Sequence, residues 1–245
     1  LALLQATSAV SNTRLRERGI TAAVLRELGA KELVEKCTLP RPPMAPIGRP
    51  GLALNPEQST VLAGLLAARE GFSCHLLEGV TGAGKTEIYL QLIADCLARG
   101  RQALVLIPEI GLTPQTLDRF NQRFAARIVV LHSGLGEAER YRSWEAARDG
   151  SAHIVIGTRS AVFTPLRSPG LIIVDEEHDG SYKQQDGFRY SARDVAVKRG
   201  QLEGCPVLLG SATPSLETLH NVATGRYALH RLTQRQLARV MFPIG

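Results

Sequence analysis

The chain has 245 residues, enough for one large domain or for a medium domain with a small companion. Its hydrophobic content of 44% is typical of a globular protein, and no apolar run reaches the ~18 residues that a membrane-spanning helix needs. A net charge of +6 is compatible with a polyanionic partner, but an ordinary charged surface would also have it. We therefore expect no membrane partner.

The four cysteines, Cys37, Cys74, Cys96 and Cys205, are far apart and form no C-x-x-C pair. This spacing predicts reduced thiols in a cytoplasmic protein and no zinc site in this chain. The chain begins without methionine and stops at Gly245, so we expect it to be a piece of a longer protein.

Residues 1–37 have the pattern of short helices and turns. Thr21 can cap a helix from Ala22 to Leu28 that Gly29 ends, and Lys31–Cys37 can form a short strand. This order fits a partial winged-helix module, but it fits any small helical appendage equally well.

Prolines are concentrated in the next segment, where residues 40–50 hold five of the thirteen prolines of the chain. A run of this kind forms neither a helix nor a strand ladder. We therefore expect a semi-rigid linker and a domain boundary at residues 38–52.

Residues 53–232 alternate between apolar strands and helices. This alternation predicts an α/β fold with a parallel sheet covered by helices on both faces, and with ligands beyond the carboxyl ends of the strands. The expected strands are His75–Glu78, Ala103–Ile107, Ile128–Leu131, His153–Gly157, Leu171–Asp175 and Val207–Gly210, and the expected helices are Lys85–Ala98, Pro114–Phe124, Glu137–Arg148, Ala192–Leu202 and Ser215–Val222.

A phosphate-binding loop follows the first of these strands. Residues 79–86 match G-x-x-x-x-G-K-[ST] between an apolar strand and an amphipathic helix, which is the context that this motif requires. We expect Lys85 to bind the β- and γ-phosphates of ATP and the Thr86 hydroxyl to bind Mg²⁺. The predicted ATP-binding residues of the loop are Gly79, Val80, Thr81, Gly82, Ala83, Gly84, Lys85 and Thr86.

Two acids follow the apolar strand that ends at Val174. We expect Asp175 to hold Mg²⁺ and Glu176 to polarise the attacking water, although such a strand can also end in a solvated turn. Gln58 lies upstream of the loop, and its amide can read the edge of adenine. The alternative for Gln58 is an exposed side chain at a helix N-terminus.

Aromatic residues cluster in residues 179–194. Tyr182, Phe188 and Tyr190 can stack on bases while Lys183, Arg189 and Arg193 meet phosphates, or the aromatic rings can pack between helices instead.

Two further segments follow strands. Thr113 and Arg159 can contact the backbone of a nucleic-acid strand, although both lie in segments that can form ordinary turns. His132 is expected to be a packing or capping residue and is left out of the catalytic set.

Several motifs together indicate a family. Asp175-Glu-Glu-His178 is similar to the D-E-x-H box of superfamily 2 helicases, and Gly210-Ser-Ala-Thr-Pro214 resembles their S-A-T motif. Gln58 fits their adenine-reading glutamine. Four longer segments are more specific, and with them residues 53–232 resemble the PriA family of primosomal replication-restart helicases: Val105–Gln115, Leu131–Leu135, Ile156–Phe163 and Ser181–Tyr190.

The resemblance implies a RecA-like P-loop NTPase lobe at 53–232, with residues 233–245 leading to a second lobe that lies outside this chain. It implies an ATP-dependent 3′–5′ DNA helicase of the bacterial nucleoid, which binds forked and single-stranded DNA, meets primosome and single-strand-binding proteins, and assembles the primosome at stalled forks. Zinc is implied only for a module outside this chain. Without the arginine of the second lobe, the fragment should be inactive.

The resemblance also implies roles for single residues. His178 joins Lys85, Asp175 and Glu176 in the catalytic set because it can sense the γ-phosphate through the S-A-T segment, where Ser211 and Thr213 couple hydrolysis to DNA. Phe188 stands where many relatives carry tryptophan. Two alternatives remain open: another superfamily 2 nucleic-acid translocase, such as an RNA helicase, and a nucleotide-switched interaction module.

Overall fold

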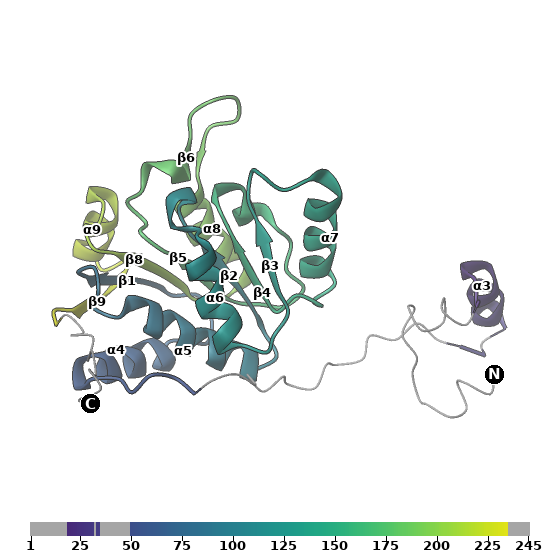
Figure 1. Cartoon of the computed structure of the whole chain (residues 1–245), viewed down its shortest axis with the longest axis horizontal. Coiled ribbons are helices and arrows are strands. Elements are labelled where there is room, and N and C mark those ends of the chain that lie inside the picture. Colours follow the sequence, from purple (N-terminus) through teal and green to yellow (C-terminus); the bar gives the residue numbers. More distant parts are fainter. Residues whose placement is uncertain (1–18, 32, 35–49, 235–245) are drawn as a thin grey trace, which may run out of the picture. The chain divides into compact units, whose positions relative to one another are not determined.

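The computed structural model describes residues 19–31, 33, 34 and 50–234 (Figure 1). The chain divides into two compact units, residues 1–42 and 43–245. The division falls within the proline-rich segment, and the assignment of domains stays a prediction.

The described part of the first unit is one helix, α3 (Ala22–Ala30). Thr21 caps it as predicted, because its side-chain oxygen accepts a hydrogen bond from the Val24 amide at 3.4 Å. Gly29 does not end the helix, since helical bonding continues until the Lys31 amide bonds to the Glu27 carbonyl at 3.2 Å. Residues 31, 33 and 34 are not in a strand, which is a correction to the predicted strand at Lys31–Cys37. Most of the winged-helix prediction lies outside the described residues.

The second unit is built on a seven-stranded sheet in the order β3-β4-β2-β5-β8-β1-β9, in which every paired neighbour is parallel. Six strands confirm the predicted ones to within about two residues, and the edge strand β9 was missed. The strands are β1 (Cys74–Gly79), β2 (Gln102–Leu106), β3 (Ile128–Leu131), β4 (Ile154–Gly157), β5 (Pro169–Val174), β8 (Val207–Ser211) and β9 (Ala228–Leu232).

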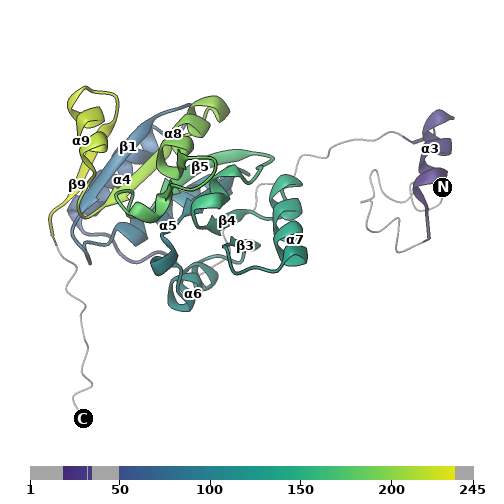
Figure 2. The same ribbon diagram turned by 90° about the horizontal axis from the view of Figure 1, so that it is seen from above.

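Helices cover both faces of this sheet (Figures 1 and 2). Successive residues of a strand point to opposite faces, so Leu77 and Ile173 enter one apolar core while Leu76 and Ile172 enter the other. A sheet buried on both sides explains why its strands are continuous apolar runs. One face carries α4 (Pro56–Ala67), α5 (Lys85–Ala98) and α6 (Pro114–Arg123), and the other carries α7 (Glu137–Arg148), α8 (Ala192–Glu203) and α9 (Leu216–Ala223).

Short elements complete the carboxyl edge of the sheet. They are three 3₁₀ turns, η1 (Glu109–Gly111), η2 (Arg159–Phe163) and η3 (Gly180–Tyr182), and an antiparallel hairpin of β6 (Lys183–Gln184) and β7 (Tyr190–Ser191). The loop between β6 and β7 projects from the body at the top of Figure 1. No helix that the structure describes is long and apolar enough to cross a membrane.

The topology brings the sequence motifs together. Parallel strands place their carboxyl ends at one edge, and β8 lies between β1 and β5. The phosphate loop after β1, the S-A-T segment at the end of β8 and the acids after β5 are therefore neighbours, although up to 135 positions separate Gly79 from Pro214 in the sequence.

Candidate active site

The phosphate loop has the backbone that its glycines permit. Gly82 and Gly84 have φ angles of 84° and 89°, in the left-handed region that residues with a Cβ rarely adopt. The next residue, Lys85, begins α5 and is buried: its Nζ donates to the Gly79 carbonyl at 2.8 Å and lies 3.2 Å from Glu176 Oε1. A phosphate bound in the loop would therefore compete with Glu176 for this ammonium group.

Gln58 supports the loop from α4. Asn55 and Gln58 form a reciprocal capping box, in which Gln58 Oε1 accepts from the Asn55 amide at 3.0 Å. Gln58 Nε2 donates to the Ala83 carbonyl in the loop at 2.9 Å, and the side chain is fully buried. The alternative of an exposed glutamine is therefore wrong. In this conformation the amide faces protein partners, so adenine reading by Gln58 stays a prediction.

Asp175 lies directly after β5 and is held by two tyrosines. Tyr89 Oη donates to Asp175 Oδ1 at 2.9 Å, and Tyr182 Oη donates to the Asp175 carbonyl at 2.7 Å. Burial raises the pKa of Asp175, and the neighbouring Glu176 carboxylate adds to this shift. Burial and the charge of Asp175 likewise raise the pKa of both tyrosines well above the usual range, so they stay protonated donors. Neither tyrosine was predicted to hold this acid.

Glu176 has an unusual backbone conformation. Its φ angle of 45° is the one positive value of a non-glycine residue in the described chain, and such strain costs roughly 1–3 kcal/mol unless the surroundings impose it. Its carboxylate lies between Lys85 on one side and the Ala212 amide, which donates to Oε2 at 3.3 Å, on the other. Glu176 therefore joins the phosphate loop to the S-A-T segment.

His178 contacts that same segment. Its Nδ1 lies 2.7 Å from Ser211 Oγ and 3.6 Å from Glu176 Oε2. Ser211 is buried and also accepts from the Thr213 amide at 3.0 Å. The predicted bond between His178 and the S-A-T segment is present, and γ-phosphate sensing stays a prediction.

Glu177, between these residues, is the main site residue that the sequence reading missed. It is 2% exposed, and its carboxylate accepts from the Ser215 amide at 2.7 Å and from Thr218 Oγ1 at 2.9 Å. Its ionic partner is Arg193, whose Nη1 lies 3.2 Å from Oε2. Arg193 is buried, which corrects the expectation that it meets phosphates. The middle position of the box gave no signal, because an acid beside two catalytic acids looks like a third surface charge.

A pocket of about 730 Å³ opens over the loop and the acids, a volume suited to a nucleotide. Its far wall was not predicted: residues 50–52 and Arg119, Gln122 and Arg123 of α6 line it. Thr86 and Asp175 supply oxygen donors to the same pocket, and oxygen donors are what Mg²⁺ prefers. The residues present therefore fit a nucleotide with its magnesium ion.

The predicted DNA-facing residues fall into two groups. Tyr182 is 1% exposed, and the Nη1 of Arg159 is bonded to the Ser181 and Lys183 carbonyls, both at 3.2 Å. Tyr182 therefore cannot stack on a base without leaving the core, and Arg159 braces the hairpin. Both are corrections, with the same physical reason: tertiary packing placed these side chains inward.

The second group is exposed. Phe188 is 81% exposed, and its ring lies 6.2 Å from that of Tyr190, which in turn meets Phe163 edge-on at 4.9 Å. Lys183 and Arg189 are also exposed. Thr113 caps α6 by accepting from the Thr116 amide at 3.2 Å. His132 accepts from the Gly134 amide at 3.1 Å, the local capping role that was predicted.

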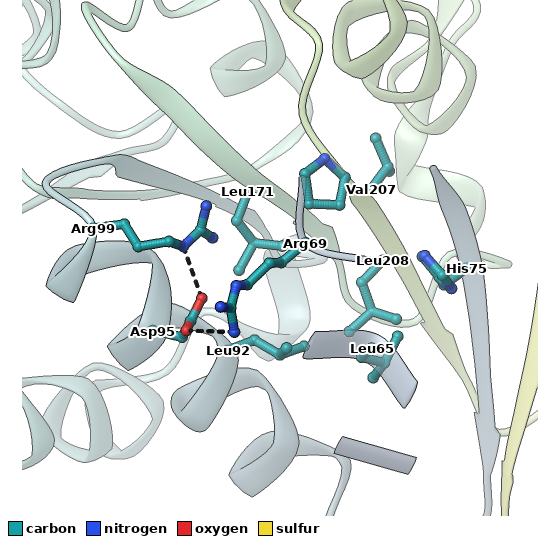
Figure 3. A pocket seen from close by; sticks show the side chains of 10 residues that line it. Leu65, Arg69, His75, Leu92, Asp95, Arg99, Leu171, Val207 and Leu208 are labelled. Atoms are coloured by element: carbon teal, nitrogen blue, oxygen red, sulfur yellow. Dashed lines mark hydrogen bonds and ion pairs between the residues drawn. The ribbon is translucent and has the colours of Figure 1, made fainter. Parts of the chain in front are cut away.

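A second hollow lies near the amino ends of β1 and β8 (Figure 3). Its volume of about 20 Å³ is close to that of one water molecule, too small for a nucleotide. Its polar wall is Asp95, which binds Arg99 Nε at 2.9 Å and lies 3.5 Å from Arg69 Nη1.

Comparison with known proteins identifies the class. A model of the DEAD/DEAH box helicase family matches residues 55–222. The match covers more than half of the chain, and the chain belongs to this family.

Within the family, the chain is similar to replication restart protein PriA of several bacteria. It is 48% identical over 225 residues to PriA of Haemophilus influenzae, an alignment that covers 88% of this chain and 31% of the relative. For PriA of Bacillus subtilis the identity is 51% over 166 residues, covering 68% and 21%. The predicted family is confirmed, and the chain spans less than a third of the length of these two relatives.

Solved structures show the same fold at low identity. RecG bound to a three-way DNA junction gives a TM-score of 0.57 at 19% identity, covering 89% of this chain and 26% of that one. The Hef helicase domain of Pyrococcus furiosus gives 0.52 at 20% identity, covering 72% and 37%. These likenesses confirm the predicted RecA-like α/β lobe.

Proposed function

We propose that this chain is the ATP-binding motor lobe of a DNA helicase that acts in replication restart and primosome assembly. The observation that carries the proposal is the contact of three motifs through one side chain: Glu176 meets Lys85 of the phosphate loop at 3.2 Å and the Ala212 amide of the S-A-T segment at 3.3 Å. The similarity to the PriA proteins supports the biological role and the cytoplasmic, nucleoid-associated location. Movement in the 3′–5′ direction is part of the proposal.

The contacts suggest how the residues act in sequence. The phosphates of ATP take up the Lys85 ammonium, which frees Glu176 from its ion pair to accept a hydrogen bond from the attacking water. Mg²⁺, held by Thr86 and Asp175, would neutralise charge on the β- and γ-phosphates. The Ala212 amide keeps Glu176 joined to the S-A-T segment, so the state of the site can reach that segment.

The proposed nucleic-acid surface is the exposed part of the hairpin. Phe188 offers an aromatic face for stacking, Lys183 and Arg189 offer positive charge, and Thr113 and Thr213 are exposed at the same edge of the sheet. Forked and single-stranded DNA are the proposed ligands. Primosome and single-strand-binding proteins are proposed as partners from the resemblance.

ATP turnover tests the proposal. The full-length protein that contains this chain is assayed with forked DNA, single-stranded DNA and RNA, and compared with Lys85→Ala. We expect forked DNA to stimulate most and Lys85→Ala to lower turnover at least about 100-fold, since Lys85 is the cation closest to the proposed γ-phosphate position. The matched control is Lys198→Ala, because Lys198 is exposed on α8 and bonded to Gln201 at 2.9 Å.

The other outcomes have defined meanings. Strongest stimulation by RNA would favour a different superfamily 2 translocase, and normal function of the Glu176→Gln protein would favour a nucleotide-switched interaction module. The 245-residue chain alone should turn over ATP roughly 10³-fold more slowly than the full-length protein, because an arginine from another lobe typically supplies that factor. Comparable rates would contradict this part of the proposal.

A further inference from the structure

Both ends of the projecting hairpin are bonded to the turn that holds Glu176. At the entrance to the hairpin, Tyr182 Oη donates to the carbonyl of Asp175, the residue before Glu176, at 2.7 Å. At its exit, Arg193 Nη1 lies 3.2 Å from the carboxylate of Glu177, the residue after Glu176. Residues 182–193 therefore straddle the proposed water-polarising acid.

The two anchors are buried, whereas the hairpin loop is not. Tyr182 and Arg193 are nearly inaccessible, while Phe188 is 81% exposed. A nucleic-acid strand can therefore touch the loop but not the anchors. Any effect of the anchors on hydrolysis has to pass through the protein.

The base of the hairpin is braced from a third side. Arg159 Nη1 donates to the carbonyls of Ser181 and Lys183, on either side of Tyr182, both at 3.2 Å. The base therefore moves with its anchors, and a displacement of the loop reaches the acid turn instead of being absorbed at Tyr182.

Glu177 extends the connection to the S-A-T side. Its carboxylate accepts from Ser215 and Thr218, and Arg193 Nη1 donates to Ser215 Oγ at 2.6 Å. The acid turn is thus fastened to the hairpin and to the start of α9 by one buried network. Because a buried charge that loses its partner is strongly destabilised, these members move together or not at all.

The backbone of Glu176 supplies the element that responds. Its φ of 45° persists only while its surroundings impose it. If either anchor is released, residue 176 can relax toward a negative φ, which moves its carboxylate relative to Lys85 and the Ala212 amide.

We propose that Tyr182 and Arg193 are positioning residues, which transmit a displacement of the hairpin by single-stranded nucleic acid to Glu176 and so set the rate of hydrolysis. The inference rests on the proposed ATPase function. It assigns to these two residues an internal linkage in place of the nucleic-acid contact that the sequence predicted for them.

Tyr182→Phe and Arg193→Gln test the linkage in the full-length protein, since the first removes one hydroxyl and the second one charge. The readout is the ratio of ATP turnover with saturating single-stranded DNA to turnover without DNA, together with the Kd for that DNA. We expect the ratio to fall at least about fivefold while the Kd stays within about twofold. Arg193→Lys should recover part of the ratio, because an ammonium group can still pair with Glu177.

Two matched controls remove similar groups elsewhere. Arg199 is also largely buried on α8, and it is bonded to Glu203 at 2.9 Å and to the Val162 carbonyl at 2.8 Å. Tyr227 is half-buried and its hydroxyl meets Cys74. Arg199→Gln and Tyr227→Phe should leave the ratio unchanged.

An unchanged ratio in both test variants, with the wild type stimulated by DNA, overturns the inference alone. So does a fall of both turnover rates by one common factor, which would indicate a purely structural role, or a DNA Kd that weakens in proportion to the ratio. A wild type that no nucleic acid stimulates overturns the proposed function and this inference with it.

Discussion

Gly210 is the position where a single methyl group should disturb the acid site most directly. It lies in β8 beside Tyr89, and a Cβ at this position would overlap Tyr89 Oη and lie 2.8 Å from Tyr89 Cζ. The Tyr89 ring is buried in the core beneath the sheet, and its hydroxyl is bonded to Asp175. In Gly210→Ala, the ring therefore has to shift and the hydrogen bond is lost.

The magnitude follows from three terms. Overpacking in a filled core costs about 1–3 kcal/mol, and loss of a hydrogen bond to a carboxylate costs about 1.5–3 kcal/mol. The smaller entropy of the unfolded alanine chain offsets about 0.4–1 kcal/mol, which leaves a net loss of about 2–5 kcal/mol. For a domain of this size, the melting temperature should fall by about 4–20 °C.

A double-mutant cycle measures whether the clash with Tyr89 is the cause. Thermal and urea unfolding are compared for the wild type, Gly210→Ala, Tyr89→Phe and the double variant. Because Tyr89→Phe removes both the overlapping oxygen and the hydrogen bond, the double variant should be more stable than the sum of the single effects by about 1–3 kcal/mol. Additive effects, or a loss below about 1 kcal/mol in Gly210→Ala, would refute the reasoning.

Two further predictions concern stability and binding. Burial and the adjacent His230 ring lower the pKa of His75 from 6.5 to about 4, so its contribution to stability is present above pH 6.5 and is lost as the pH falls toward 4 (Figure 3). Between about pH 7.5 and about pH 5 the wild type should lose about 2 kcal/mol by urea unfolding that His75→Gln does not lose, and equal losses would contradict this. Phe188→Ala should change stability by less than about 0.5 kcal/mol but weaken single-stranded DNA binding roughly 5- to 150-fold in fluorescence anisotropy, whereas Tyr182→Ala should cost about 3–5 kcal/mol of stability. Equal stability losses in these two variants would show that the burial assignment is wrong.

Local patterns in the sequence were sufficient for most of the sheet. The apolar runs that became β1 to β5 and β8 are unambiguous because a strand covered on both faces has apolar residues at every position. The edge strand β9 has polar residues such as His230 and Arg231 among its apolar ones, so the same criterion missed it. The start of α4 had a readable signal in Asn55 and Gln58, whose spacing is that of a capping box.

The candidate site divides in a similar way. Lys85, Asp175 and Glu176 were predicted because their chemistry depends on short motifs at fixed spacing, and these motifs follow strands that the topology places at one edge. Tyr89, Arg119 and Gln122 carry no such motif. They reach the site from the sides of α5 and α6, and only the packing of those helices on the sheet puts them there.

By itself, the sequence determined the fold class, the family and the nucleotide-binding motifs, because backbone conformation at glycines, strand periodicity and motif spacing are local properties. Only the tertiary structure decided which charged and aromatic residues face outward. Tyr182 and Phe188 lie six positions apart in one aromatic segment, yet one is buried against Asp175 and the other projects into solvent. Composition is the same for both, and burial depends on what the rest of the chain places beside each ring.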